Sequence, residues 1–288
     1  MTRERRSEII GRAEEGSNVN IVLASGFLVP QTVGPINYFR DVKPRLEAKG
    51  HHVLAHKVPI VASCKVRAKA LADAIQGEFK NDPVHIIAHS MGGLDSRMMI
   101  GQNFNGLGEK GRILSLTTLS TPHQGSPLAD LLAGKGPDDV RRPLFDALNG
   151  VGIDIRGLRD LTSDVDGALA NVPEDFPHIR CCSYAASGRG GARPTAIVLL
   201  PGHGYIKKQT GQDNDGAVAV GSATYGEFKG TWPCDHVQVV GHDLDTLLLP
   251  DKIKQAVQDA LRLGAEFDHL SRFDAIVADL QKIEVGQP

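Results

Sequence analysis

The sequence is short of cysteines and aromatic residues, and it has no long apolar run. A membrane-spanning helix needs about 18 consecutive apolar residues, and no such run occurs in the 288 residues. The four cysteines follow no zinc-ligand spacing, and two of them are sequence neighbours that are poorly placed to bridge each other. We therefore expect no membrane span and no zinc site, and we expect reduced thiols at Cys64, Cys181, Cys182 and Cys234.

The chain also lacks an excess of charge of either sign. Its formal net charge is −2, so the composition predicts no nucleic-acid partner and no surface for anionic membranes. The first residues, MTRERRSEIIGRAEEGSNVN, are basic and then acidic, without the apolar core and cleavage site of a secretory signal. We expect a cytoplasmic protein; the alternative is a secreted protein whose export signal is missing from this sequence.

What is present is the composition of a globular protein with a sizeable core, because 41% of the residues are hydrophobic and 23% are charged. Short apolar runs alternate with helix-like segments, which predicts an α/β fold with a mostly parallel sheet and helices on both faces. The predicted strands are 19–25, 52–58, 84–90, 112–120 and 179–185, and the predicted helices are 37–50, 64–80 and 92–104. In the 64–80 helix, the spacing predicts a buried face with Val66, Ala70, Ala74 and Phe79.

The second half of the chain departs from this alternation. Residues 126–177 have the pattern of several short helices broken by glycine and proline. They predict a helical lid or cap insert within a single domain of residues 1–288, with ordinary crossover helices as the alternative. Glycine- and proline-rich sequence over 185–216 predicts long surface loops, and residues 250–283 predict two closing helices.

One stretch, VHIIAHSMGGLDSR (84–97), indicates a very sharp turn between a strand and a helix. Ala88 and Gly92 flank Ser90 two residues to either side, and small residues there let the strand and the helix approach each other. Such a turn strains its central residue and exposes the hydroxyl of that residue above the sheet. Ser90 is therefore the candidate nucleophile.

A serine nucleophile needs a general base, and the base needs a carboxylate that orients it. Hydrolases with this turn place the carboxylate and then the histidine after the serine in the chain. His236, in WPCDHVQVVGH, is the best candidate base, with His242 as the alternative; His123 is expected to shape the wall of the site. The segment GQDNDGAVAVGSA offers Asp213 and Asp215.

We favour Asp215 as the orienting carboxylate, at the junction between a turn and an alternating AVAV strand. Asp235 immediately precedes His236 and is too close to it in sequence to orient it. A developing oxyanion needs two backbone N–H donors. We expect them from Met91, at the start of the helix, and from Phe27, in the loop LASGFLVP after the first strand.

Four motifs together resemble those of the bacterial triacylglycerol lipases of the α/β-hydrolase superfamily. They are SGF (25–27), AHSMGGLDSR (88–97), STPHQGSPLAD (120–130), and NDGAVAVGSA (214–223) followed by DHVQVVGH. The likeness runs from about Val19 to His242. It implies an α/β-hydrolase fold, a lid at 126–177, and a serine carboxylic ester hydrolase that needs no cofactor. It also implies a triad of Ser90, Asp215 and His236, with oxyanion donors at Phe27 and Met91.

The chain departs from that family at two positions of the site. Ser25 stands where the family usually has a histidine, and Gln238 stands where a carboxylate often binds calcium, so we predict no calcium site of that type. An acyltransferase or a thioesterase would use the same triad, and a non-catalytic binding protein of the same fold is the alternative from another class. The substrate is expected to be a small-molecule or lipid ester.

Overall fold

The computed structural model describes most of the chain between residues 18 and 284. The described residues are 18–26, 38–56, 62–139, 141–142, 145–146, 161–162, 169, 172–188, 195–196, 199–243 and 267–284. Within them, six strands form one parallel sheet in the order β2-β1-β3-β4-β5-β6. The strands are β1 (Asn20–Ala24), β2 (His52–His56), β3 (Val84–His89), β4 (Ile113–Leu119), β5 (Arg180–Ala186) and β6 (Glu227–Trp232). The five predicted strands and the mostly parallel sheet are confirmed, and β6 was not predicted.

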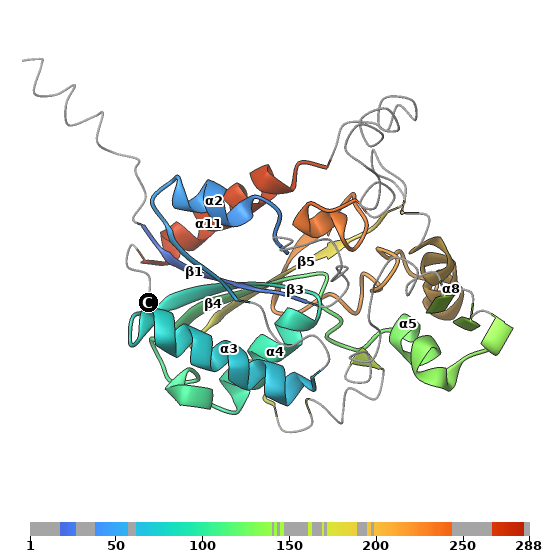
Figure 1. Ribbon diagram of the computed structural model, residues 1–288, viewed down its shortest axis with the longest axis horizontal. Helices are drawn as coiled ribbons and strands as arrows, with labels where there is room; N and C mark the ends of the chain where they lie inside the picture. Colours follow the sequence, from blue (N-terminus) through green and yellow to red (C-terminus); the bar gives the residue numbers. More distant parts are fainter. Residues whose placement is uncertain are drawn as a thin grey trace, which may run out of the picture.

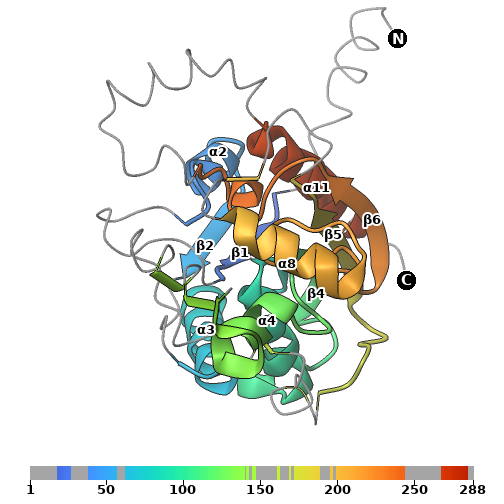
Figure 2. The ribbon, with the colours of Figure 1, turned by 90° about the vertical axis from the view of Figure 1, so that its right-hand side faces the viewer.

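Helices cover both faces of this sheet, as predicted. In Figures 1 and 2, α2 (Val42–Glu47) and α11 (His269–Glu284) lie on one face, and α3 (Cys64–Phe79) and α4 (Met91–Gly101) lie on the other. Figure 1 also shows α5 (Pro127–Asp130) and α8 (Leu200–Thr210) beyond one end of the strands. The short helices are η1 (Phe104–Gly106), the π-helical turn η2 (Leu131–Lys135) and η5 (Gln238–Val240).

The two-sided cover explains why the strands have nearly continuous apolar sequences. Side chains of a strand alternate between faces, so a strand covered on both faces needs apolar residues at every position. In β1, Val22 and Ala24 pack into the core on the α3–α4 side, whereas Ile21 and Leu23 pack into the core on the α2–α11 side. All four side chains are buried.

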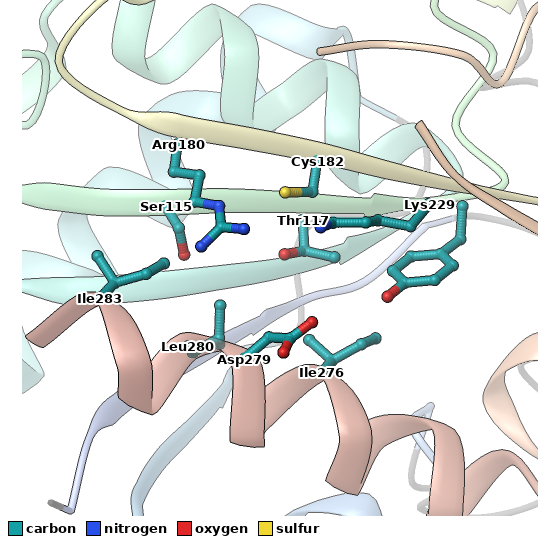
Figure 3. A pocket seen from close by; sticks show the side chains of 10 residues that line it. Ser115, Thr117, Arg180, Cys182, Lys229, Ile276, Asp279, Leu280 and Ile283 are labelled. Atoms are coloured by element: carbon teal, nitrogen blue, oxygen red, sulfur yellow. The ribbon is translucent and has the colours of Figure 1, made fainter. Parts of the chain in front are cut away.

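A small cavity remains between α11 and the sheet (Figure 3). Apolar side chains of α11, Ile276, Leu280 and Ile283, line one wall. Polar side chains of the strands line the other wall, among them Ser115 and Thr117 of β4. The cavity thus has one apolar wall from α11 and one partly polar wall from the sheet.

The predicted buried face of α3 is wrong at three of its four positions. Val66 is 53% exposed, and Ala70 and Ala74 are only partly buried, whereas Phe79 is buried. The stripe that packs on the sheet is Cys64, Arg67, Ala68, Leu71, Ala72, Ile75 and Phe79. This stripe contains Arg67, and a hydrophobicity pattern assigns a charged residue to the exposed face of a helix. The buried face was therefore misplaced.

Two predictions for the second half of the chain are also wrong. Residues 185–216 are not loop throughout, because α8 occupies Leu200–Thr210 and ends at Gly211 in the left-handed conformation. The AVAV segment forms no strand: Asn214 and Ala219 make one isolated antiparallel bridge across a tight reversal. The side chains of Ala217, Val218 and Ala219 are buried in the core, which accounts for their apolar pattern.

The remaining predictions for the second half are tested only in part. The closing helix α11 is confirmed, whereas 250–266 lies outside the described residues. Most of the predicted lid also lies outside them; its described beginning is α5 and η2, and α5 packs against α8. None of the four cysteines, all of which are described, is part of a disulfide, which agrees with the predicted reduced thiols. Among the helices in the described part of the chain, none has the length and apolarity that crossing a membrane requires.

Candidate active site

Ser90 occupies a strained turn at the carboxyl end of the central strand β3. Its backbone has φ 56° and ψ −130°, a conformation that non-glycine residues rarely adopt. The N–H of Ser90 donates to the carbonyl of Leu119 at 2.9 Å, which ties the turn to β4. A Cβ atom at Gly92 would lie 2.3 Å from the carbonyl oxygen of Ala24, so only glycine permits this approach of α4 to β1. The turn therefore needs the small residue that its sequence provides.

Three side chains from distant segments form one hydrogen-bonded chain at this turn. The hydroxyl of Ser90 donates to Nε2 of His236 at 2.9 Å, and Nδ1–H of His236 donates to Oδ2 of Asp215 at 2.7 Å. Ser90 is 2% exposed, and His236 and Asp215 are fully buried. The structure thus brings together the serine, histidine and aspartate that the sequence singled out.

The turn around Asp215 fixes its carboxylate in place. Oδ1 accepts the backbone N–H groups of Ala217 and Val218 at 2.9 and 2.7 Å, which leaves Oδ2 for His236. The backbone N–H of His236 donates to the carbonyl of Asp215 at 3.0 Å, so the two loops are also joined through the main chain. Asp215 therefore holds the imidazole of His236 in one orientation.

Asp235 anchors the loop that carries His236. Its Oδ1 accepts the N–H groups of Val237 and Gln238, and its Oδ2 accepts the N–H of Ala196 at 3.0 Å. Burial raises the pKa of this carboxyl to about 7, whereas these backbone donors favour the ionised form. Asp235 thus contacts the backbone beside the base, which agrees with its exclusion as the orienting carboxylate.

Of the two predicted oxyanion donors, Met91 lies within the described residues. Met91 is the first residue of α4, so its N–H belongs to the helix turn that has no intrahelical acceptor. Phe27 lies outside the described residues. The preceding residue, Gly26, passes beside the nucleophile: an added Cβ would lie 2.6 Å from Cβ of Ser90. The backbone at Gly26, one residue before Phe27, thus lies beside the nucleophile.

A buried ion pair below this loop was not found from the sequence. Arg67 of α3 and Asp95 of α4 are both fully buried, with Nε of Arg67 donating to Oδ2 of Asp95 at 2.9 Å. The guanidinium also donates to the carbonyl of Ser25 at 3.0 Å. The signal in the sequence for this buried ion pair was the position of Arg67, at helical spacing from Cys64 and Leu71.

The other candidates from the sequence lie elsewhere. His242 donates from Nε2 to the carbonyl of Tyr38 at 3.1 Å, and exposed Asp213 pairs with Lys207. His123 is buried, with its ring stacked on Tyr225.

Burial, and then the charge of Arg97, lower the pKa of His123 well below its usual range. Gln238 stands where the lipases that the sequence resembles often have a calcium-binding carboxylate. Its Oε1 accepts the N–H of Asp235.

Comparison with known proteins gives a curated sequence relative and several structural neighbours. No protein-family model matches the chain. It is 33% identical over 221 residues to triacylglycerol lipase 2 of Saccharomyces cerevisiae, and this match covers 71% of the chain and 62% of the relative. The chain thus spans less than two thirds of the length of this curated relative.

Solved structures of lipases and esterases resemble the fold over most of the chain. The lipase of Staphylococcus hyicus superposes with a TM-score of 0.65 at 16% identity and covers 94% of this chain and 98% of its own. A metagenomic carboxyl esterase gives 0.65 at 18% identity, covering 95% of this chain and 77% of its own. The mature lipase of Bacillus licheniformis gives 0.59 at 19% identity, covering 85% and 96%. The chain therefore has the α/β-hydrolase fold of bacterial lipases and esterases and is a homologue of a triacylglycerol lipase.

Proposed function

We propose that the protein is a serine hydrolase that cleaves carboxylic esters through an acyl-enzyme on Ser90. The observation that carries this proposal is the chain of hydrogen bonds from Ser90 through His236 to Asp215, at 2.9 and 2.7 Å. The homology to a triacylglycerol lipase and the fold shared with lipases and esterases support the same activity. The substrate class is a small-molecule or lipid ester.

The reaction follows from the geometry in two half-reactions. Nε2 of His236 takes the hydroxyl proton as Oγ of Ser90 attacks the ester carbonyl, and Asp215 stabilises the imidazolium that forms. The N–H of Met91, together with an N–H from the loop after Gly26, stabilises the oxyanion. The alcohol leaves with the proton from His236, and water then repeats the sequence on the acyl-enzyme. Apart from the ester and water, the proposed chemistry uses only groups of this chain.

The acyl-chain preference belongs to the segment that follows β4. We infer that residues 126–177 form a cap over Ser90, which would set the length of the acyl group and make transient contact with a lipid surface. Its described beginning supports this position: Ser126 donates to the carbonyl of Ala217, two residues from Asp215. The first residue of the proposed cap is thus joined to the turn that holds the carboxylate.

The test is hydrolysis of p-nitrophenyl esters from acetate to palmitate by the native chain and by Ser90→Ala. Loss of the nucleophile should lower kcat by about four to six orders of magnitude, because the partners of the triad act as one unit. A preference for long chains would identify a lipase, and a preference for short chains would identify a carboxylesterase.

The matched control is Ser96→Ala on the same helix. The hydroxyl of Ser96 donates to the carbonyl of Gly92 at 2.7 Å and is also buried. This variant should hydrolyse the esters at nearly the native rate. Equal activity of Ser90→Ala and the native chain, or no hydrolysis of any ester by the native chain, would refute the proposal.

A further inference from the structure

A tyrosine and a second histidine lie directly behind the base, and the triad mechanism does not use them. Tyr38 precedes α2, and His89 is the last residue of β3, immediately before Ser90. The hydroxyl of Tyr38 lies 2.7 Å from Nδ1 of His89. The rings of His89 and His236 lie 4.7 Å apart between centroids, at an angle of 44°. His89 is fully buried, so this arrangement excludes water from the back of the base.

The turn that carries Tyr38 is fastened to the loop that carries His236. Nε2 of His242 donates to the carbonyl of Tyr38 at 3.1 Å. The N–H of Arg40 donates to the carbonyl of Val240 at 3.1 Å, and the guanidinium of Arg40 donates to the carbonyl of Gly241 at 3.3 Å. Since three hydrogen bonds join the two segments, Tyr38 is held in a fixed position relative to the base.

The same hydroxyl also reaches the loop beside the oxyanion site. A Cβ atom at Gly26 would lie 2.7 Å from Oη of Tyr38 and 2.8 Å from the carbonyl oxygen of His89. The backbone N–H of Gly26 faces the hydroxyl and favours its ionised form, although burial, the larger effect, raises the pKa of Tyr38. Tyr38 therefore lies between the loop after β1 and the histidine behind the base.

The chemistry of the neighbours decides which nitrogen of His89 carries the proton. Nε2 is buried without a well-formed hydrogen bond among the described residues, and the backbone group that acts on this ring is the carbonyl of His236. A carbonyl only accepts and favours a proton on the nitrogen that it faces; because Tyr38 occupies Nδ1 at 2.7 Å, we assign the proton to Nε2. In a neutral imidazole the other nitrogen is then an acceptor, and the hydroxyl of Tyr38 donates to Nδ1.

We propose that Tyr38 and His89 are a positioning pair, in which the tyrosine hydroxyl keeps His89 neutral with its proton on Nε2, so that it supports His236 from behind without opposing its protonation. The inference rests on the proposed ester hydrolysis, because it concerns the base of that reaction. A cationic His89 beside His236 would repel the imidazolium that forms when Ser90 is deprotonated.

The groups that face His89 all favour the neutral state except one. Burial, and next the charge of His236, lower the pKa of His89 well below its usual range, and the charge of His242 acts in the same direction. The carbonyl of His236 raises this pKa. Arg67 and Asp95 face the hydroxyl of Tyr38 and act on it with opposite signs. Donation from Tyr38 adds a hydrogen bond that only the neutral imidazole can accept.

The first test is Tyr38→Phe, with Tyr184→Phe as the matched control. Tyr184 is a partly buried tyrosine whose ring packs on Trp232, and it lines the cavity under α11. Tyr38→Phe should lower kcat about five- to tenfold with KM unchanged, the size of effect expected for one lost hydrogen bond. As the pH is lowered, its kcat/KM should begin to fall at a higher pH than that of the native protein. Tyr184→Phe should change neither quantity. A profile of native shape, whatever its height, would overturn the proposal.

The second test is a double-mutant cycle with His89→Gln, which hydrogen-bonds but does not titrate. Tyr38→Phe should have little further effect on kcat in the His89→Gln background, because the tyrosine acts through the histidine. Independent, additive losses would contradict the pairing. If His89→Gln does not fold, the pH profile of Tyr38→Phe decides alone.

A third measurement does not depend on ester turnover. Nitrogen NMR of the histidine rings should find His89 neutral, with its proton on Nε2, from about pH 5 to 8 in the native protein. In Tyr38→Phe, the ring should change tautomer or begin to protonate within that range. If native His89 carries its proton on Nδ1, the inference is wrong even where the protein hydrolyses esters. If the protein is inactive but His89 behaves as described, the proposed function fails instead.

Discussion

Asp215 shows at the scale of the residue how a backbone turn controls a reactive side chain. Two backbone N–H groups occupy Oδ1, so only Oδ2 is free to accept Nδ1–H of His236. This arrangement selects one tautomer of the base, the one whose Nε2 can accept the proton of Ser90. Both side chains are fully buried, so water does not compete for these hydrogen bonds.

Replacing this carboxylate should leave the protein folded but slow. Asp215→Asn should lower kcat about 10⁴-fold, because an amide that keeps its oxygen on the two N–H donors presents NH₂ to His236 and reverses the tautomer. Kinetics on p-nitrophenyl butyrate and a thermal melt would measure the two properties. Asp213→Asn, two residues away, is the control: Asp213 is exposed, and its carboxylate pairs with Lys207 on the surface. Similar losses in both variants would argue against a specific role for Asp215.

At the scale of the element, neighbouring residues of β4 have different tasks because they face opposite sides of the sheet. Thr117 lines the cavity under α11 (Figure 3). The hydroxyl of Thr118 lies 3.0 Å from Nε2 of His123 and 3.4 Å from the carbonyl oxygen of Cys182. His123 stacks on Tyr225, and Arg97 of α4 lies over the same ring at 4.4 Å. Thr118 thus joins β4 to the cluster that His123 and Tyr225 form with Arg97 of α4.

The two threonines should respond differently to the same substitution. Thr118→Val should lower the free energy of unfolding by about 1–3 kcal/mol, because it leaves a buried nitrogen of His123 without its partner. Thr117→Val should change it by less than about 1 kcal/mol, since its hydroxyl faces a cavity and makes no hydrogen bond to the described residues. Denaturant unfolding of both variants would measure the difference. Equal losses would contradict the assignment of the two faces.

Prediction from the sequence succeeds for features that depend on residues close together in the chain. The turn at Ser90 was predictable because its requirements, an apolar strand and small flanking residues, are local in the chain. Asp215 and His236 followed from their residue types and their order after the serine. Buried Arg67 was missed because its partners, Asp95 and the carbonyl of Ser25, meet it only in the folded chain. The same holds for Tyr38 and His89, whose role depends on contacts with His236.

At the scale of the whole molecule, the parallel sheet brings these distant residues to the carboxyl ends of its strands. All six strands run in the same direction, so the loops after β1, β3 and β6 leave the sheet at the same end. Those loops carry Gly26, Ser90 and His236, and the turn before β6 adds Asp215. Helices α2, α3, α4 and α11 pack on the two faces of the sheet (Figure 1), and the site lies at the carboxyl ends of the strands. This is the position at which open α/β sheets bind their ligands.

The central claim, that Ser90 is an activated nucleophile, is tested most directly by reaction with a fluorophosphonate. The native protein should gain one adduct by intact-mass spectrometry, and peptide mapping should locate it on Ser90. Ser90→Ala should gain none, and Asp215→Asn should react more slowly because its base is wrongly oriented. No adduct on the folded native protein, or an adduct on another residue, would contradict the account.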